Sequence, residues 1–416
     1  MIKSIASTVL TRIAVMALTF VVVVLNTNYI GATGQGTVAL ISLGILLQVA
    51  INNFVGGTAV VYLATRVSPG QLMPPALIWT LLSAVLFYFL LPALDVVPTE
   101  YVYDVVWLGV IQSLFTFQQQ LLLGKRRIHG YNISLMTQMA SLLIAVAYGY
   151  IALGNRDASA YVDGLYVSFW VTLLVSIFIN RRDIQAFSFS DFFAVLGRLL
   201  RHGFFGQTSN VIQLLINRML YVILDQFTGR AQVGLFSVGM QVNEAALAPS
   251  KSMATVQFSE ISASRKREQS LHITLNMLKV SCYITALALL VLCVIPNGVF
   301  QWVFGDEIDG LNGVILRLAP GMFALSVSGI LAHHFSGTGR FYVNTLGSVL
   351  ALVVVLTGGY LYIPEGGITA AAWALSAAFS LQALFLLIMF MVMDKPNAKD
   401  LNFKVDLSVF RQHSDQ

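Results

Sequence analysis

Six charged side chains lie inside long apolar stretches of this sequence: Arg12, Arg218, Lys251, Lys279 and Arg317, with Glu244 as the one acid. A charge within a membrane is expensive and usually faces a bundle interior or an aqueous cavity. Arginine offers a planar fork of donors that suits phosphate or carboxylate, and lysine offers a compact point charge. The excess of cations therefore predicts a site for an anionic ligand.

Residues 231–258 place polar side chains at helical spacing. Steps of four and three residues put one stripe on a single helix face: Ser237, Gln241, Glu244, Ala248, Lys251 and Thr255. Pro249 is predicted to bend this helix. We expect the cationic cavity to be formed by Arg12, Arg218, Lys251 and Arg317, and to be lined by Asn26, Gln112, Gln207, Asn210, Asn217 and Gln241. Glu244 is the candidate for ion coupling, because burial raises and neighbouring cations lower the pKa of a carboxyl group.

Structural roles for these residues remain open at this point. Glu244 paired with Lys251 or Arg218 would hold helices together without binding a substrate. The long side chains of Arg12, Lys279, Arg317 and Arg218 reach far enough to place their charges at a membrane surface.

The composition is that of an integral membrane protein. Of 416 residues, 57% are hydrophobic and 10% are charged, and the mean hydropathy is +0.78. Ordinary soluble domains carry roughly 25% charged residues. A soluble enzyme, a disordered chain and a secreted disulfide scaffold are excluded. Cys282 and Cys293 would lie roughly 16 Å apart along one helix, too far for a disulfide bond.

Twelve apolar stretches are long enough to cross a membrane, which takes about 20 residues. They are 7–28, 37–64, 72–91, 105–123, 132–153, 163–179, 204–224, 231–258, 272–295, 311–335, 341–363 and 367–393. A shorter amphipathic segment, 190–202, is predicted to lie in the membrane interface. The sequence thus predicts an all-α polytopic protein with an N-terminal lobe, 1–203, and a C-terminal lobe, 204–416, that ends in a cytoplasmic tail.

The loop charges predict the orientation. With twelve spans, one side has Arg156 and Arg230 as its basic residues and carries ten acidic residues. The other side collects 17 basic residues: Lys3, Arg66, Lys125, Arg126, Arg127, Arg181, Arg182, Arg198, Arg201, Arg265, Lys266, Arg267, Arg340, Lys395, Lys399, Lys404 and Arg411. The positive-inside rule makes this second side, and with it both termini, cytoplasmic.

An internal repeat relates the two sets of six spans. Moving the sequence by 195 residues places Thr33, Gly34, Val38, Leu40, Ser42 and Gly44 on Thr228, Gly229, Val233, Leu235, Ser237 and Gly239. A weaker match pairs 124–127 with 337–340, after the fourth and tenth spans. Six spans per repeat make the repeats parallel, an arrangement used by transporters that bind between two halves.

The sequence gives little support for catalysis, a metal or a cofactor. His333 and His334 are adjacent, point about 100° apart and form a poor metal pair, so we interpret them as interfacial. The segment 306–309, with three acidic residues, is interpreted as a solvated turn. The Gly-Lys-Ser/Thr signature of a phosphate-binding loop is missing from the sequence, and no soluble domain or nucleic-acid partner is expected.

The six-plus-six repeat, the turn with Gly34 and Gly36, and the basic loop after the fourth span resemble polysaccharide flippases. These belong to the multidrug/oligosaccharidyl-lipid/polysaccharide exporter (MOP) superfamily, and O-antigen flippases are the most similar type in length and charge distribution. The resemblance implies a MATE-like fold, a bacterial inner-membrane location and contact with membrane lipids. It also implies translocation of an undecaprenyl-pyrophosphate-linked oligosaccharide repeat to the periplasmic leaflet, by alternating access.

In such flippases basic cavity residues are thought to engage the pyrophosphate, a role that would fall here on Arg12, Arg218, Lys251 and Arg317. A proton or sodium gradient is a candidate energy source. Two alternatives stay open: a multidrug or small-molecule antiporter of the same superfamily, and a membrane-embedded glycan polymerase or ligase.

Overall fold

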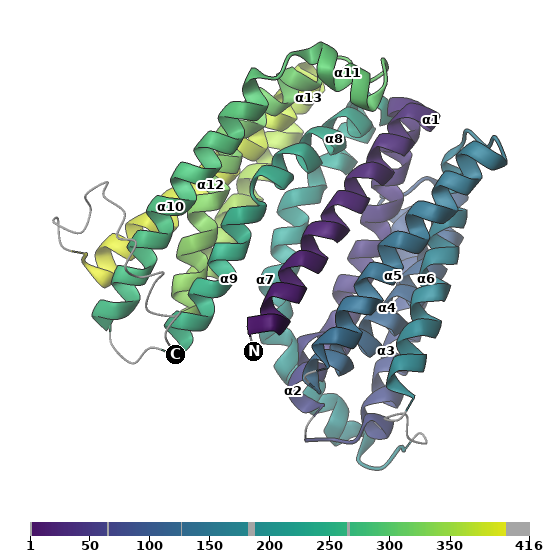
Figure 1. Cartoon of the computed structure of the whole chain (residues 1–416), viewed down its shortest axis with the longest axis vertical. Helices are drawn as coiled ribbons and strands as arrows, with labels where there is room; N and C mark the ends of the chain where they lie inside the picture. Colours follow the sequence, from purple (N-terminus) through teal and green to yellow (C-terminus); the bar gives the residue numbers. More distant parts are fainter. Residues whose placement is uncertain (1, 65, 126, 182–187, 264–266, 397–416) are drawn as a thin grey trace. The chain divides into compact units, whose positions relative to one another are not determined.

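The computed structural model describes residues 2–64, 66–125, 127–181, 188–263 and 267–396. Over these residues the chain forms thirteen α-helices and no β-strand, so the predicted all-α class is confirmed (Figure 1). Several parts of the predicted cytoplasmic side lie outside the described residues: Arg126, Arg182, Arg265, Lys266, Lys399, Lys404, Arg411 and the tail from 397 to 416.

The helices follow the predicted apolar stretches. Their bounds are α1 Ile2–Gly56, α2 Thr58–Leu63, α3 Pro69–Ala93, α4 Val102–Gly124, α5 Ile128–Ala147, α6 Ala158–Asn180 and α7 Phe192–Thr228. The later ones are α8 Arg230–Ala246, α9 Ala248–Ala263, α10 Arg267–Val294, α11 Asn297–Phe304, α12 Leu311–Gly337 and α13 Phe341–Asp394. Two short elements, η1 (Thr99–Tyr101) and η2 (Tyr148–Ala152), flank α4 and α5.

Seven helical stretches of the described chain are long and apolar enough to cross a membrane. Two of them, Leu10–Leu63 and Phe341–Asp394, are 54 residues long and each contains one glycine with a positive φ, Gly31 (67°) or Gly367 (54°). Each therefore corresponds to two predicted spans. The remaining three predicted spans are α4, α7 and the pair α8–α9, where polar side chains lower the hydropathy. The predicted bend near Pro249 is present as the break between α8 and α9.

The chain divides into two compact units. Unit 1 comprises Met1–Leu214, Gly229–Leu235 and Gln301–Ile308, and unit 2 comprises Leu215–Thr228, Phe236–Phe300 and Asp309–Gln416. In unit 1, α1 packs against α3, α4 and α5, and α4 against α6; in unit 2, α12 packs against α9, α10 and α13 (Figure 1). The segment predicted as a separate interfacial helix, 190–202, continues into the seventh span as one helix, α7.

The repeat is visible at the start of α8, within unit 1. Gly31 and Gly229 both have positive φ, 67° and 84°, and a new helical run begins after each. Five residues further on, a Cβ on Gly36 would lie 1.9 Å from the Arg230 carbonyl oxygen, and one on Gly234 would lie 1.9 Å from that of Ala32. This reciprocal contact pairs positions 198 residues apart. The sequence match at 195 is therefore off by three residues, close to one helical turn, which keeps the same helix face.

The second predicted match, between 124–127 and 337–340, is confirmed, because its paired residues occupy equivalent structural positions. Gly124 ends α4 and Gly337 ends α12, and Arg127 and Arg340 precede α5 and α13 with similar backbone angles, φ/ψ of −85°/60° and −95°/51°.

The acidic segment after α11 is more than the solvated turn expected from the sequence. Glu307 accepts a hydrogen bond from the backbone N–H of Ala32 (3.0 Å). Asn28 donates to the Val303 carbonyl (2.8 Å), and the rings of Phe20 and Phe304 meet edge to face. These contacts hold 301–308 within unit 1 and supply an acceptor for the helix start that follows Gly31.

Asp394, at the end of α13, is the centre of a buried ionic network in unit 2. Arg340 donates to both carboxylate oxygens (2.8 and 3.1 Å), and His334 Nε2 donates to one of them (3.1 Å). The other ring nitrogen of His334 bonds Thr274, and Arg267 donates to the Asp394 carbonyl. Asp394 and His334 are each 1% exposed. His334 is therefore a buried structural residue and not an interfacial one.

Candidate functional site

Arg218 lies in the part of α7 that belongs to unit 2. Its Nη1 donates to the hydroxyl of Tyr221, three residues on, and its guanidinium lies 5.1 Å from the centre of that ring. Tyr221 in turn packs edge to face on Phe236, which is fully buried. Residues three apart share a helix face. The aromatic pair therefore fixes the direction of the cation.

Glu244 of α8 joins this arrangement. It is near enough to interact electrostatically with both Arg218 and Tyr221. The structure thus brings together one predicted cation and the predicted ion-coupling acid. In such a cluster the guanidinium of Arg218 can bind an anionic group. The carboxyl group of Glu244 beside it can bind a proton.

The other two predicted cations of unit 2 behave differently. Lys251 is exposed on α9, beyond the break that follows α8. Arg317 on α12 bends back to donate to the Gly313 carbonyl one turn earlier (2.7 Å). The backbone carbonyl of Arg317 accepts from Ser376 of α13 (2.6 Å), so this turn is tied to the neighbouring helix. Asn217 and Gln241 are half-buried.

The remaining predicted residues lie in unit 1. Arg12 is exposed on α1 and Gln112 is half-buried on α4. Asn26 is 1% exposed and accepts from the Tyr150 hydroxyl (2.9 Å). On α7, Asn210 donates to the Gln207 side chain (3.2 Å). The eleven predicted residues are thus divided between the units, and a single cavity that contains them remains a prediction.

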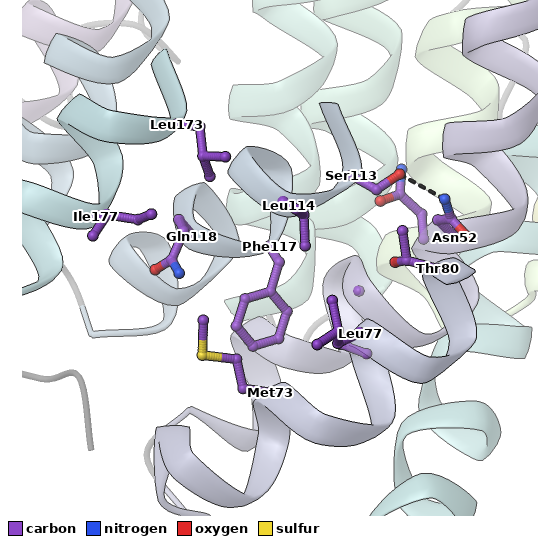
Figure 2. Close-up of a pocket in the computed structure, with 13 residues that line it drawn as sticks. Asn52, Met73, Leu77, Thr80, Ser113, Leu114, Phe117, Gln118, Leu173 and Ile177 are labelled. Carbon is purple, nitrogen blue, oxygen red and sulfur yellow. Dashed lines mark hydrogen bonds between the residues drawn. The ribbon is translucent and has the colours of Figure 1, made fainter. Parts of the chain in front are cut away.

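Unit 1 contains a cavity of about 200 Å³ that the sequence analysis missed. α1, α3, α4 and α6 each contribute to its wall (Figure 2). Apolar side chains form most of the lining: Met73, Ala76, Leu77, Leu114, Phe117, Leu173 and Ile177. Among the described residues that line it, none belongs to the eleven predicted ones.

The polar side chains of this cavity are uncharged, and Asn52, Ser113 and Gln118 among them hydrogen-bond to side chains of unit 1. Asn52 donates to Ser113 (2.6 Å), as Figure 2 shows, and accepts from Ser83. At the opposite side, Asn180 donates to the Gln118 side-chain oxygen (3.0 Å). Each of these amides and hydroxyls is a single polar residue within an apolar stretch, so no sequence motif identified them. A search for single amides at the same membrane depth in neighbouring spans would have found Asn52 and Gln118.

No family model and no curated protein sequence matches this chain, but solved structures do. An inward-facing multidrug resistance transporter of the MATE family superimposes with a TM-score of 0.76 at 14% identity, over 94% of this chain and 100% of that one. The lipid II flippase MurJ, in an inward closed conformation, gives 0.75 at 13%, over 94% and 88%. The fold is that of the MATE and MurJ transporters.

A third structure shares this MATE-like fold. It is a MOP superfamily transporter from Pyrococcus furiosus, described as having reversed polarity of its binding pocket, with a TM-score of 0.64 at 16% identity over 95% and 97% of the two chains. The MATE-like fold expected from the sequence is therefore confirmed over nearly the whole chain. At these identities the likeness is one of fold.

Proposed function

We propose that this chain is a flippase that moves an undecaprenyl-pyrophosphate-linked oligosaccharide repeat from the cytoplasmic to the periplasmic leaflet of a bacterial inner membrane. The observation that carries the proposal is the charge within its spans, five bases against one acid, in a fold shared with MurJ. A pyrophosphate has the charge that such a site selects. The distribution of loop charges supports cytoplasmic termini.

The proposed mechanism is alternating access. The anionic head binds Arg218, Lys251, Arg12 and Arg317 from the cytoplasmic side, and the lipid tail stays in the bilayer. Glu244, beside Arg218, couples the cycle to a proton or sodium gradient. Transport by Glu244→Gln is expected to lose its dependence on the gradient; retention of the full dependence would remove Glu244 from the mechanism.

The substrate class is tested in vesicles that contain the purified protein and a fluorescent polyprenyl-pyrophosphate glycan in one leaflet. Flipping above the level of protein-free vesicles is expected, and no flipping would contradict the proposal. The alternative, a multidrug antiporter, is favoured by the MATE likeness. It predicts resistance to cationic drugs in an exporter-deficient strain, whereas the flippase predicts none, because a cation exporter should present acids.

A further inference from the structure

Two of the helices that line the unit 1 cavity, α4 and α6, are each followed directly by a basic residue, Lys125 and Arg181. Its lining residues on α4 and α6 extend to Gln118 and Ile177. Lys125 and Arg181 follow these by seven and four residues, or about 10 and 6 Å along a helix. Met73 is near the start of α3, and Gly56 ends α1 shortly before Arg66. The cavity therefore lies in the half of the membrane that the loop charges predict to be cytoplasmic.

The cavity lining is partly exposed on unit 1, at Asn53 and Gly56 of α1 and at four apolar side chains. Met73, Leu77, Leu114 and Ile177 are partly exposed in its lining. Beside them, Leu81 of α3 is 48% exposed and Leu174 and Phe178 of α6 are 61% and 62% exposed. On membrane-spanning helices such side chains meet lipid hydrocarbon.

The chemistry of the lining selects an apolar occupant. The amides of Asn52 and Gln118 already have partners within the protein, Ser113 and Asn180. A polar ligand that binds these two amides would have to break their existing hydrogen bonds. Apolar cavities stay free of water and take apolar guests.

Two cations flank the same end in a geometry that suits phosphate. The Arg181 guanidinium lies 4.1 Å from the ring centre of Phe178, next to the lining residue Ile177, and the Arg66 guanidinium lies 3.8 Å from that of Tyr62. A guanidinium stacked on a ring face keeps its donors in its own plane, directed sideways. Such donors match an anionic head at the membrane surface above an apolar chain.

We propose that, before the head group reaches the cations within the spans, this cavity binds the first part of the isoprenoid tail of the substrate in the cytoplasmic leaflet, with the pyrophosphate at Arg66 and Arg181. The inference rests on the proposed function. A polyprenyl pyrophosphate has one hydrocarbon chain and a multiply charged head, which match one cavity beside several cations. A phospholipid has two chains and a single phosphodiester.

The test uses an undecaprenyl pyrophosphate with a photoactive group in its first isoprene units, added to the full-length protein in vesicles. Irradiation is expected to label peptides of α3, α4 and α6, and excess unlabelled undecaprenyl pyrophosphate is expected to remove at least four-fifths of the label. Labelling spread evenly over the lipid-facing helices would overturn the proposal, as would equal labelling by phosphatidylglycerol with a photoactive chain.

Two filled-cavity variants make the test specific. Leu77→Trp and Ile177→Trp are each expected to reduce labelling at least five-fold. Leu81→Trp and Leu174→Trp, one turn or less away but outside the lining, should keep it. Normal labelling of either filled variant that remains folded contradicts the proposal. Arg66→Ala/Arg181→Ala should weaken capture of the pyrophosphate but not of a neutral undecaprenol probe, and equal loss for both contradicts the head-group assignment.

The failure of this inference can be told apart from failure of the proposed function. If vesicles flip the glycan normally with both Leu77→Trp and Ile177→Trp, the cavity assignment fails and the flippase stands. If the cavity captures the undecaprenyl probe specifically but no glycan is flipped, the flippase fails and the cavity remains a polyprenyl site.

Discussion

Polar side chains are held in different ways in the two compact units. In unit 1, Asn52, Ser83 and Ser113 form a neutral network beside an apolar cavity. In unit 2, Arg218 donates to Tyr221, and Glu244 is near enough to interact electrostatically with both. Asp394 likewise binds Arg340 and His334. The two units thus carry different polar chemistry, with neutral hydrogen bonds beside an apolar cavity in unit 1 and charged side chains in unit 2.

The ionic network of unit 2 is expected to contribute most to stability. Asp394→Ala would leave Arg340 and buried His334 without their acceptor, and removing one partner of a buried pair costs about 3–5 kcal/mol. Thermal unfolding in detergent should show a clear fall in Tm. Asp306→Ala, at an exposed position, is the control. An unchanged Tm for Asp394→Ala would show that the network does not hold the helices.

Gly36 of α1 and Gly234 of α8 mark a close backbone contact within unit 1. Gly36→Ala would place a methyl group on the Arg230 carbonyl, and overpacking of this kind costs about 1–3 kcal/mol. Gly56→Ala has open space and should have little effect. Equal unfolding temperatures for the two variants would contradict the close contact.

The neutral network of unit 1 should contribute less. Ser113→Ala removes the acceptor for Asn52, and hydrogen bonds between membrane helices are worth on average about 0.6 kcal/mol. A fall in Tm as large as that of Asp394→Ala would show that the neutral network of unit 1 contributes as much to stability as the ionic network of unit 2. The same unfolding assay checks this outcome.

Hydropathy and helical spacing predicted the number of helical spans, the break near Pro249 and the matched basic turns before Arg127 and Arg340. These features depend on local sequence. The Asp394 network joins residues 60 and 54 positions apart, and the cavity joins single amides from separate helices, so neither leaves a local pattern. The repeat register was missed by three residues because a shift of nearly one turn preserves the apolar face.

Of the candidate site, the association of Arg218 with Glu244 was predicted from the sequence as a possible pair. The aromatic support from Tyr221 and Phe236 was not predicted.

The central claim is that the cations within the spans bind the anionic head of the substrate. Its most direct test is the rate at which vesicles containing Arg218→Ala/Lys251→Ala flip a fluorescent polyprenyl-pyrophosphate glycan. Arg198→Ala, an exposed cation near the start of α7, is the control at matched protein level. The double variant is expected to flip the glycan at the rate of protein-free vesicles, and the control is expected to flip it at the wild-type rate. Flipping by the double variant at the wild-type rate would contradict the central claim.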